Sequence, residues 1–70
     1  MRTKYYVSND GIITEYATDF DFVSKVVNLL VDGFNNFDDF HYSLTGHEIE
    51  DDPDYDYQLT FTIYGWVNRE

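Results

Sequence analysis

The chemically most distinctive residues of this chain are the carboxylates of one short run. Within residues 48–56, acidic residues occupy every second position, namely Glu48, Glu50, Asp52, Asp54 and Asp56, and Asp51 adds a sixth. In an extended backbone, alternate side chains project to the same side, with anchor points roughly 6.5–7 Å apart. A row of negative charges at this pitch is similar to the phosphates of a nucleic-acid strand. We expect Asp38 and Asp39 to broaden the row into a patch, and the patch to bind a basic partner.

The charge distribution supports this interpretation. The net charge is −10, and the four basic residues are Arg2, Lys4, Lys25 and Arg69, so that no Lys or Arg lies between Val26 and Asn68. Direct nucleic-acid binding and binding to anionic membranes are unfavourable for such a chain, whereas a basic protein surface attracts it. The alternative is a solvated connection that keeps a small protein soluble and protects a sheet edge.

Catalytic and metal-binding signatures are weak. The segment 52–56 begins like a calcium-binding loop, but Tyr57 and Ile63 stand where an EF-hand needs Gly and Glu. His41 and His47 have no recognised ligand spacing, and no serine lies in a nucleophile-elbow context. The sequence therefore predicts no catalytic residue, no metal site and no cofactor, and we do not expect an enzyme.

Two aromatic residues near the C-terminus complete the expected contact surface. Tyr64 and Trp66 share the parity of the polar positions of the last strand, opposite Phe61 and Ile63. Tyr and Trp are favoured as anchors in protein interfaces. We expect both side chains to be exposed for partner contact, although the alternative for most aromatics here is core or edge packing.

One helix is expected at the centre of the chain. Over Asp19 to Phe34, the apolar residues fall at helical spacing, at Phe20, Val23, Val26, Val27, Leu30 and Phe34. Three further apolar residues, Phe22, Leu29 and Val31, widen this stripe to more than half of the helix circumference. Thr18 is suited to the N-cap and Gly33 to the C-terminal end. Because its flanks have the composition of strands, we expect this helix to pack its wide apolar face against a sheet.

Four strands are expected around the helix, over residues 3–8, 12–17, 40–49 and 55–67. Asn9-Asp10-Gly11 indicates a tight hairpin turn, and a two-residue turn places Val7 opposite Thr14. A three-residue loop places Val7 opposite Ile13, which suits a core face better. Gly46 is expected to mark a bulge or a bend in the third strand.

The order β-β-α-β-β predicts an α+β fold with a four-stranded, mainly antiparallel sheet and one helix packed on one face. We expect a single domain over residues 1–70. There is no cysteine, no signal-peptide pattern and no apolar run of transmembrane length, so a soluble cytoplasmic protein is expected.

In size, acidity and element order, the chain resembles the small nucleic-acid-mimicking inhibitors of bacteriophages and mobile elements, a class that includes anti-CRISPR, anti-restriction and uracil-DNA glycosylase inhibitor proteins. The resemblance is compositional and rests on Asp32 together with the acidic residues named above. It implies a DNA or RNA mimic that blocks the basic nucleic-acid-binding surface of a defence or repair complex in a bacterial host cell.

The alternative function belongs to a different class. A small structural or regulatory module of this kind would homodimerise through its open sheet face or an edge strand, because a short chain buries only a modest core by itself. Its acidity would then serve solubility.

Overall fold

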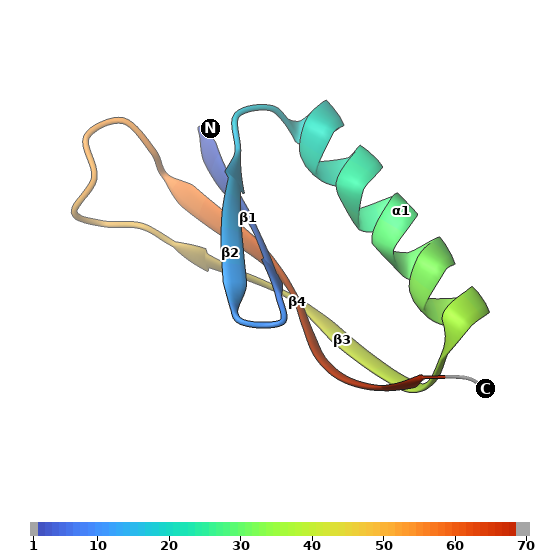
Figure 1. Ribbon diagram of the computed structural model, residues 1–70. Coiled ribbons are helices and arrows are strands. Elements are labelled where there is room, and N and C mark those ends of the chain that lie inside the picture. The colour runs from blue at the N-terminus through green and yellow to red at the C-terminus, as the bar shows by residue number, and fades with distance from the viewer. Residues whose placement is uncertain (1, 69–70) are drawn as a thin grey trace.

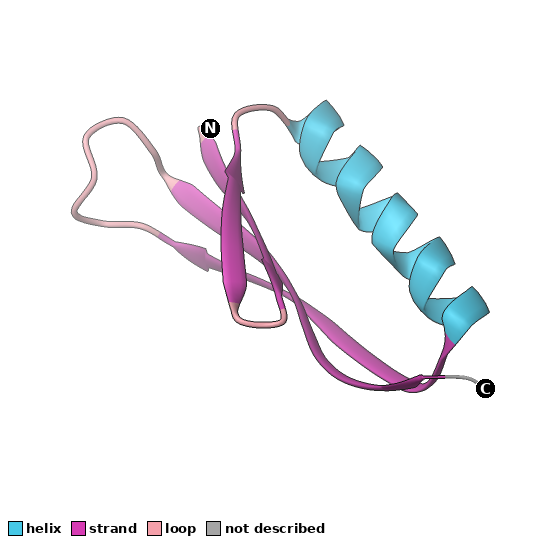
Figure 2. Cartoon of the chain, in the orientation of Figure 1, coloured by secondary structure: helices cyan, strands magenta, loops and turns pink. Residues whose placement is uncertain are grey.

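The chain forms one sheet with one helix on one of its faces. The computed structural model describes residues 2–68 and contains β1 (Thr3–Asn9), β2 (Ile12–Tyr16), α1 (Asp19–Asn36), β3 (Phe37–Glu48) and β4 (Tyr57–Asn68). The expected α+β fold and the order β-β-α-β-β are confirmed (Figures 1 and 2). The molecule is elongated, with extents of 47 × 19 × 16 Å. Within residues 2–68, no helix combines the length and the apolar character that crossing a membrane requires.

The sheet is mixed and not purely antiparallel. Its strand order is β2-β1-β4-β3, and the two central strands, β1 and β4, run parallel. Both hairpin pairs are antiparallel. The parallel pairing matters for function because it brings the N-terminal end of β1 beside the start of β4, where the acidic run ends.

The first hairpin closes with a two-residue turn. Asp10 and Gly11 both have positive φ, at 53° and 78°, which matches the right-handed twist of the flanking strands. Val7 therefore pairs with Thr14, which is the register of the two-residue turn among the two that the sequence left open. The local preference of Asp-Gly for this turn outweighed the better apolar match of the other register.

The helix begins where the sequence predicted and ends later. Thr18 is the N-cap, and its Oγ1 accepts a hydrogen bond from the Asp21 amide at 3.1 Å. Gly33 does not end the helix, because α1 continues to Asn36. Gly33 instead lies buried inside it, where an added Cβ would collide with the ring of Phe40.

The structure buries only part of the wide apolar face expected of α1. Phe22 is buried, and the residues beside it on the core side are Val26, Leu29 and Leu30. The remaining members of the expected apolar face are exposed, and they form a stripe at Phe20, Val23, Val27, Val31 and Phe34. The helix has two apolar faces, and spacing alone could not tell which one would cover the sheet.

The core of the domain is small. Its buried apolar side chains among residues 2–68 are Val7, Phe22, Phe61 and Ile63, and Phe61 is only 1% exposed. The ring of Tyr5 lies 5.0 Å from that of Phe22 and so joins the sheet to the helix. A core of this size leaves the free energy of unfolding small.

The irregularity of β3 lies near its start. Asp39 has a φ of 50°, and the pairing with β4 shifts between Asp38 and Tyr42. Gly46 pairs in register with Leu59, so of the two alternatives expected there, a bulge or a bend, the bulge is excluded. Gly46 is needed for a different reason, because the ring of Tyr57 lies across the space that a side chain would fill.

Candidate functional site: the acidic loop

The connection between β3 and β4 carries most of the acidic run. We call residues 48–56 the acidic loop. Glu48 is the last residue of β3, and residues 49–56 belong to no strand. The Ile49 amide donates a hydrogen bond to the Asp56 carbonyl at 2.9 Å, which closes the loop at its base. The expected single row of carboxylates on an extended strand is therefore wrong, and the charges are gathered on a compact loop.

The N-terminal end of β1 anchors this loop through backbone hydrogen bonds. The Asp56 amide donates to the Arg2 carbonyl at 2.8 Å, and the Arg2 amide donates to Asp56 Oδ2 at 3.1 Å. The Tyr57 amide donates to the same carbonyl at 3.2 Å. These bonds continue the parallel β1–β4 ladder into the loop and fix its C-terminal part.

Asp52 is held from two sides. Its Oδ1 accepts a hydrogen bond from the Asp54 amide at 2.9 Å, and its Oδ2 lies 3.2 Å from Lys4 Nζ. The hydrogen bond from the Asp54 amide and the ion pair with Lys4 both lower the pKa of Asp52. The same contact with the Asp52 carboxylate raises the pKa of Lys4. Asp52 therefore serves first to shape the loop.

Tyr55 contacts two cations at the acidic loop, and the sequence did not predict this role. The guanidinium carbon of Arg2 lies 5.5 Å from the centre of the Tyr55 ring, and Lys4 Nζ lies 5.1 Å from it. Both distances are within the range of cation–π contacts. Arg2 and Lys4 share one parity in the sequence, but only the parallel pairing of β1 with β4 places them at Tyr55.

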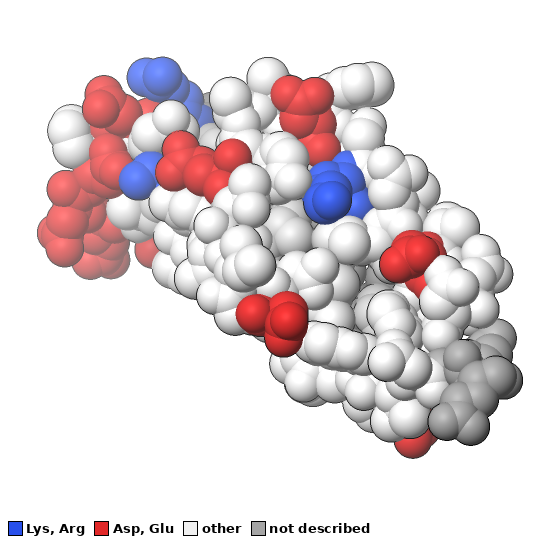
Figure 3. All heavy atoms as spheres, viewed as in Figure 1, with Lys and Arg blue, Asp and Glu red and all other residues white. Residues whose placement is uncertain are grey.

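The loop remains strongly anionic after these contacts are counted. The six carboxylates of the loop stand against Arg2 and Lys4, which leaves a net charge of −4 on the acidic loop and these two cations together. Glu48, Glu50, Asp51 and Asp54 are exposed. Figure 3 shows the acidic atoms gathered at this end, with basic atoms beside them. The arrangement can bind cationic groups of a partner by charge and hydrogen bonding.

Asp38 and Asp39 do not belong to this surface. They lie at the start of the 12-residue strand β3, and the acidic loop lies at its end, about 30 Å away at the usual rise of a strand. The expectation that they broaden the acidic row was wrong. The length of β3 separates Asp38 and Asp39 from the acidic loop, so a partner bound at the loop would not contact them in the same patch.

Of the two aromatic residues expected to be exposed, Tyr64 is exposed and Trp66 is not. Tyr64 is 63% exposed, and its ring stacks on that of His41 with 6.1 Å between centroids. Trp66 is half-buried and packs against the core, 6.2 Å from the ring of Phe37, so its expected exposure was wrong. Between the pairs Tyr42–Ile63 and His41–Gly65, β4 has one extra residue, Tyr64, and this bulge turns Trp66 toward the helix side.

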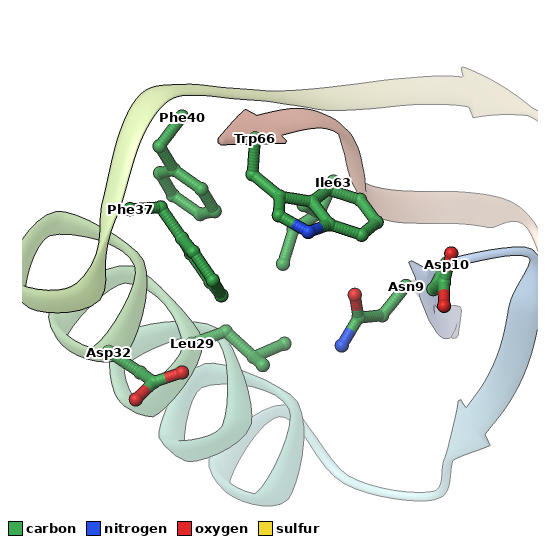
Figure 4. Close-up of a pocket in the computed structure, with 8 residues that line it drawn as sticks. All are labelled: Asn9, Asp10, Leu29, Asp32, Phe37, Phe40, Ile63 and Trp66. Carbon is green, nitrogen blue, oxygen red and sulfur yellow. The ribbon is translucent and has the colours of Figure 1, made fainter. Parts of the chain in front are cut away.

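A pocket of about 210 Å³ lies between the C-terminal half of α1, the first hairpin turn and the end of β4. In Figure 4, Trp66 and Ile63 enter it from β4, and Leu29 comes from α1. Asp10 and Asp32 lie on its rim. The lining combines aromatic and aliphatic side chains with Asn9, Asp10 and Asp32, and it contains no serine, cysteine, lysine or histidine.

Among residues 2–68, no group of three or more His, Cys, Asp or Glu side chains is arranged to hold a metal ion. No family model, curated protein or solved structure matches this chain. The functional proposal therefore depends on the geometry and charge of the acidic loop.

Proposed function

We propose that this protein is an acidic inhibitor that occupies the basic nucleic-acid-binding surface of another protein and so excludes DNA or RNA from it. The acidic loop is the contact surface, and the target is a defence nuclease, a Cas-type effector or a repair enzyme in the cytoplasm of a bacterial host. This is the activity of the phage-type inhibitors that the chain resembles.

The observation that carries the proposal is the concentration of exposed carboxylates on one anchored loop. Like charges brought together lower the stability of a small domain, so solubility alone is a poor explanation for gathering them. Arg2 and Lys4 neutralise only part of the negative charge of the loop. Lys4 pairs with Asp52, and both cations lie at the Tyr55 ring, so the exposed carboxylates remain in excess.

The geometry suits insertion into a concave surface. The acidic loop projects beyond the rest of the sheet at the end of the β3–β4 hairpin (Figure 1). Backbone hydrogen bonds from Arg2 and the ion pair of Lys4 limit the conformations of the loop before binding. A preordered loop loses less conformational entropy in a complex. Arg and Lys side chains of the target would meet Glu50, Asp51 and Asp54 as they meet phosphates.

The test is affinity capture with matched charge variants. The immobilised full chain is incubated with a nuclease-treated bacterial lysate at about 50 mM salt, where charge–charge attraction is weakly screened. We expect a basic nucleic-acid-binding protein to be retained and to be released by added salt or by duplex DNA. The variant with Glu50→Gln, Asp51→Asn and Asp54→Asn should lose this protein.

The control variant removes the same number of charges elsewhere, with Glu15→Gln, Asp10→Asn and Asp21→Asn. All three positions are exposed and lie outside the acidic loop. The control should retain the captured protein nearly as well as the unmodified chain. Equal loss from both variants, or capture of no nucleic-acid-binding protein, would count against the proposal.

A further inference from the structure

The exposed apolar stripe of α1 is unexplained by the acidic loop. Its members are between 50% and 76% exposed, and they are Phe20, Val23, Val27, Val31 and Phe34. Five large apolar side chains on one side of one helix form a contiguous patch, which a monomeric protein rarely presents without a partner. The stripe lies beside the core face and not on it, because Phe22, Val26 and Leu29 cover the sheet.

The residue types of the stripe are arranged symmetrically about Val27. Counted from Val27, valines lie four residues before and four after, and phenylalanines lie seven before and seven after. In an antiparallel helix pair with a two-fold axis at Val27, each residue meets its mirror position in the other copy. Phe20 would then lie beside Phe34 of the second copy, and Val23 beside Val31. The small valines at the centre allow the two helices to approach to the usual 8–10 Å.

We propose that two copies of this chain pair through α1 as an antiparallel, two-fold symmetric homodimer. An isologous interface needs a self-complementary patch, and the palindromic stripe provides one. This inference concerns a different surface from the proposed inhibitory function and does not depend on it.

Charge favours the antiparallel arrangement over the parallel one. The acidic loop lies toward the end of the molecule where α1 begins, and α1 ends toward the opposite end (Figure 1). Antiparallel pairing therefore places the two acidic loops at opposite ends of the dimer, whereas parallel pairing brings them together. The flanking polar residues Ser24, Asn28 and Asn35 are uncharged, so no like charges oppose the contact itself.

The available area suits a small dimer. From their exposed fractions, the five side chains offer on the order of 500 Å² per copy, or roughly 1,000 Å² in total, which reaches the lower bound for specific interfaces. Tyr42 and Leu44 on β3 are also exposed on the helix side, and the ring of Phe34 lies 5.9 Å from that of Tyr42. These residues extend the patch beyond the helix. The other exposed large apolar side chains among residues 2–68 are Ile12 and Ile13 on β2 and Tyr64 and Val67 on β4, and Ile13 lies on the open face of the sheet.

The first test measures the mass of the full chain in solution by sedimentation over a range of concentrations. We expect a dimer whose dissociation constant rises by roughly 100-fold or more in Val27→Glu, because two carboxylates would be buried face to face at the two-fold axis. Glu is a better helix former than Val, so α1 should persist, and far-ultraviolet circular dichroism checks this. The control, Asn28→Glu, adds the same charge beside the stripe and should change the constant only slightly.

The second test fixes the direction of pairing by disulfide formation. The chain has no cysteine, so a single introduced cysteine reports only on its own position. Val27→Cys should form a disulfide-linked dimer on mild oxidation, whereas Phe20→Cys should not, because antiparallel pairing separates the two copies of residue 20 by about 21 Å along the helix axes.

Three results would overturn the proposal. One is a monomer at every concentration. Another is a dimer that survives Val27→Glu but is broken by Ile13→Glu on the open sheet face. The third is a Phe20→Cys variant that crosslinks as readily as Val27→Cys, which would indicate parallel helices.

Discussion

Lys4 Nζ lies 3.2 Å from Asp52 Oδ2, and this ion pair joins the first strand of the sheet to the loop between the last two. About a quarter of each side chain is exposed. The pair is separated by 48 positions in the sequence and exists because β1 and β4 run parallel at the centre of the sheet. One of the four basic residues of the chain is thus used to shape its most acidic segment.

Replacing Lys4 by Gln should loosen the acidic loop without unfolding the domain. The variant loses the ion pair with Asp52 and the cation above Tyr55, while the backbone bonds of Arg2 remain. We expect several-fold faster hydrogen exchange of the Asp54 amide, measured by NMR, and little change in β2 or α1. Lys25→Gln, which removes the same charge from the exposed side of α1, should leave that amide unchanged. Equal effects of the two variants would show that Lys4 has no local role.

Acidification should open the same contact. The pKa of Asp52 is lower in the folded state than in the unfolded state, so its stabilising contribution is present above the usual aspartate pKa, about 3.9. That contribution is lost as the pH falls through the lowered pKa. The pKa of Lys4 is raised, so Lys4 loses its charge, and the ion pair with Asp52 is lost on that account, only in strongly alkaline solution. An NMR titration of the Asp52 carboxyl carbon should give a midpoint below the usual aspartate value of about 3.9, and a midpoint above that value would contradict this account.

Gly33→Ala should destabilise the domain although alanine is the better helix former. Alanine gains about 1 kcal/mol of helix propensity, but its Cβ would collide with the Phe40 ring, and such overpacking costs about 1–3 kcal/mol. We expect a net loss of free energy of unfolding in urea denaturation. In a Phe40→Leu background the same substitution should become neutral or stabilising. Equal effects in both backgrounds would contradict the proposed collision.

Phe61→Ala should unfold a large fraction of the protein. Phe61 is 1% exposed, and truncation of a buried phenylalanine costs about 3–5 kcal/mol, which approaches the whole stability of a small domain. Circular dichroism at low protein concentration provides the measurement. Phe20→Ala is the matched control, because Phe20 is 76% exposed and should tolerate truncation when the chain is monomeric.

The sequence predicted the elements well because local signals define them. Asp10-Gly11 specifies its turn, Thr18 specifies the helix start, and the alternation of residues 57–63 specifies β4. The fold class follows from the order of these elements. The parallel pairing of β1 with β4 could not be predicted in the same way, because it depends on the order of strands in the sheet, which no local pattern encodes.

The candidate site was predicted in composition but not in geometry. The acidic loop is where the sequence placed the charges, but the run folds back on itself instead of forming an extended row. The hydrogen bonds from the Ile49 amide to the Asp56 carbonyl and from the Asp54 amide to Asp52 Oδ1 hold it in this form. Trp66 was misplaced because a bulge at Tyr64 resets the alternation of the strand. The exposed face of α1 was misjudged for a related reason: when a helix is apolar over half its circumference, tertiary contacts decide which part is buried.

Salt concentration should affect target binding and homodimer formation in opposite directions. Binding through the acidic loop weakens as salt screens attraction, whereas pairing through α1 strengthens as salt screens repulsion between two chains of net charge −10. Sedimentation and target binding measured at about 50 and 500 mM salt should therefore change in opposite directions. A change in the same direction would assign both associations to one surface.

The most direct test of the proposed function is competition between this protein and duplex DNA for the captured target. The apparent dissociation constant of the complex, measured by fluorescence anisotropy, should rise in proportion to DNA concentration, as it does for two ligands of one surface. The triple variant at Glu50, Asp51 and Asp54 should bind at least tenfold more weakly, a loss of about 1.4 kcal/mol. Simultaneous binding of DNA and protein to the target, with an unchanged constant, would contradict nucleic-acid mimicry.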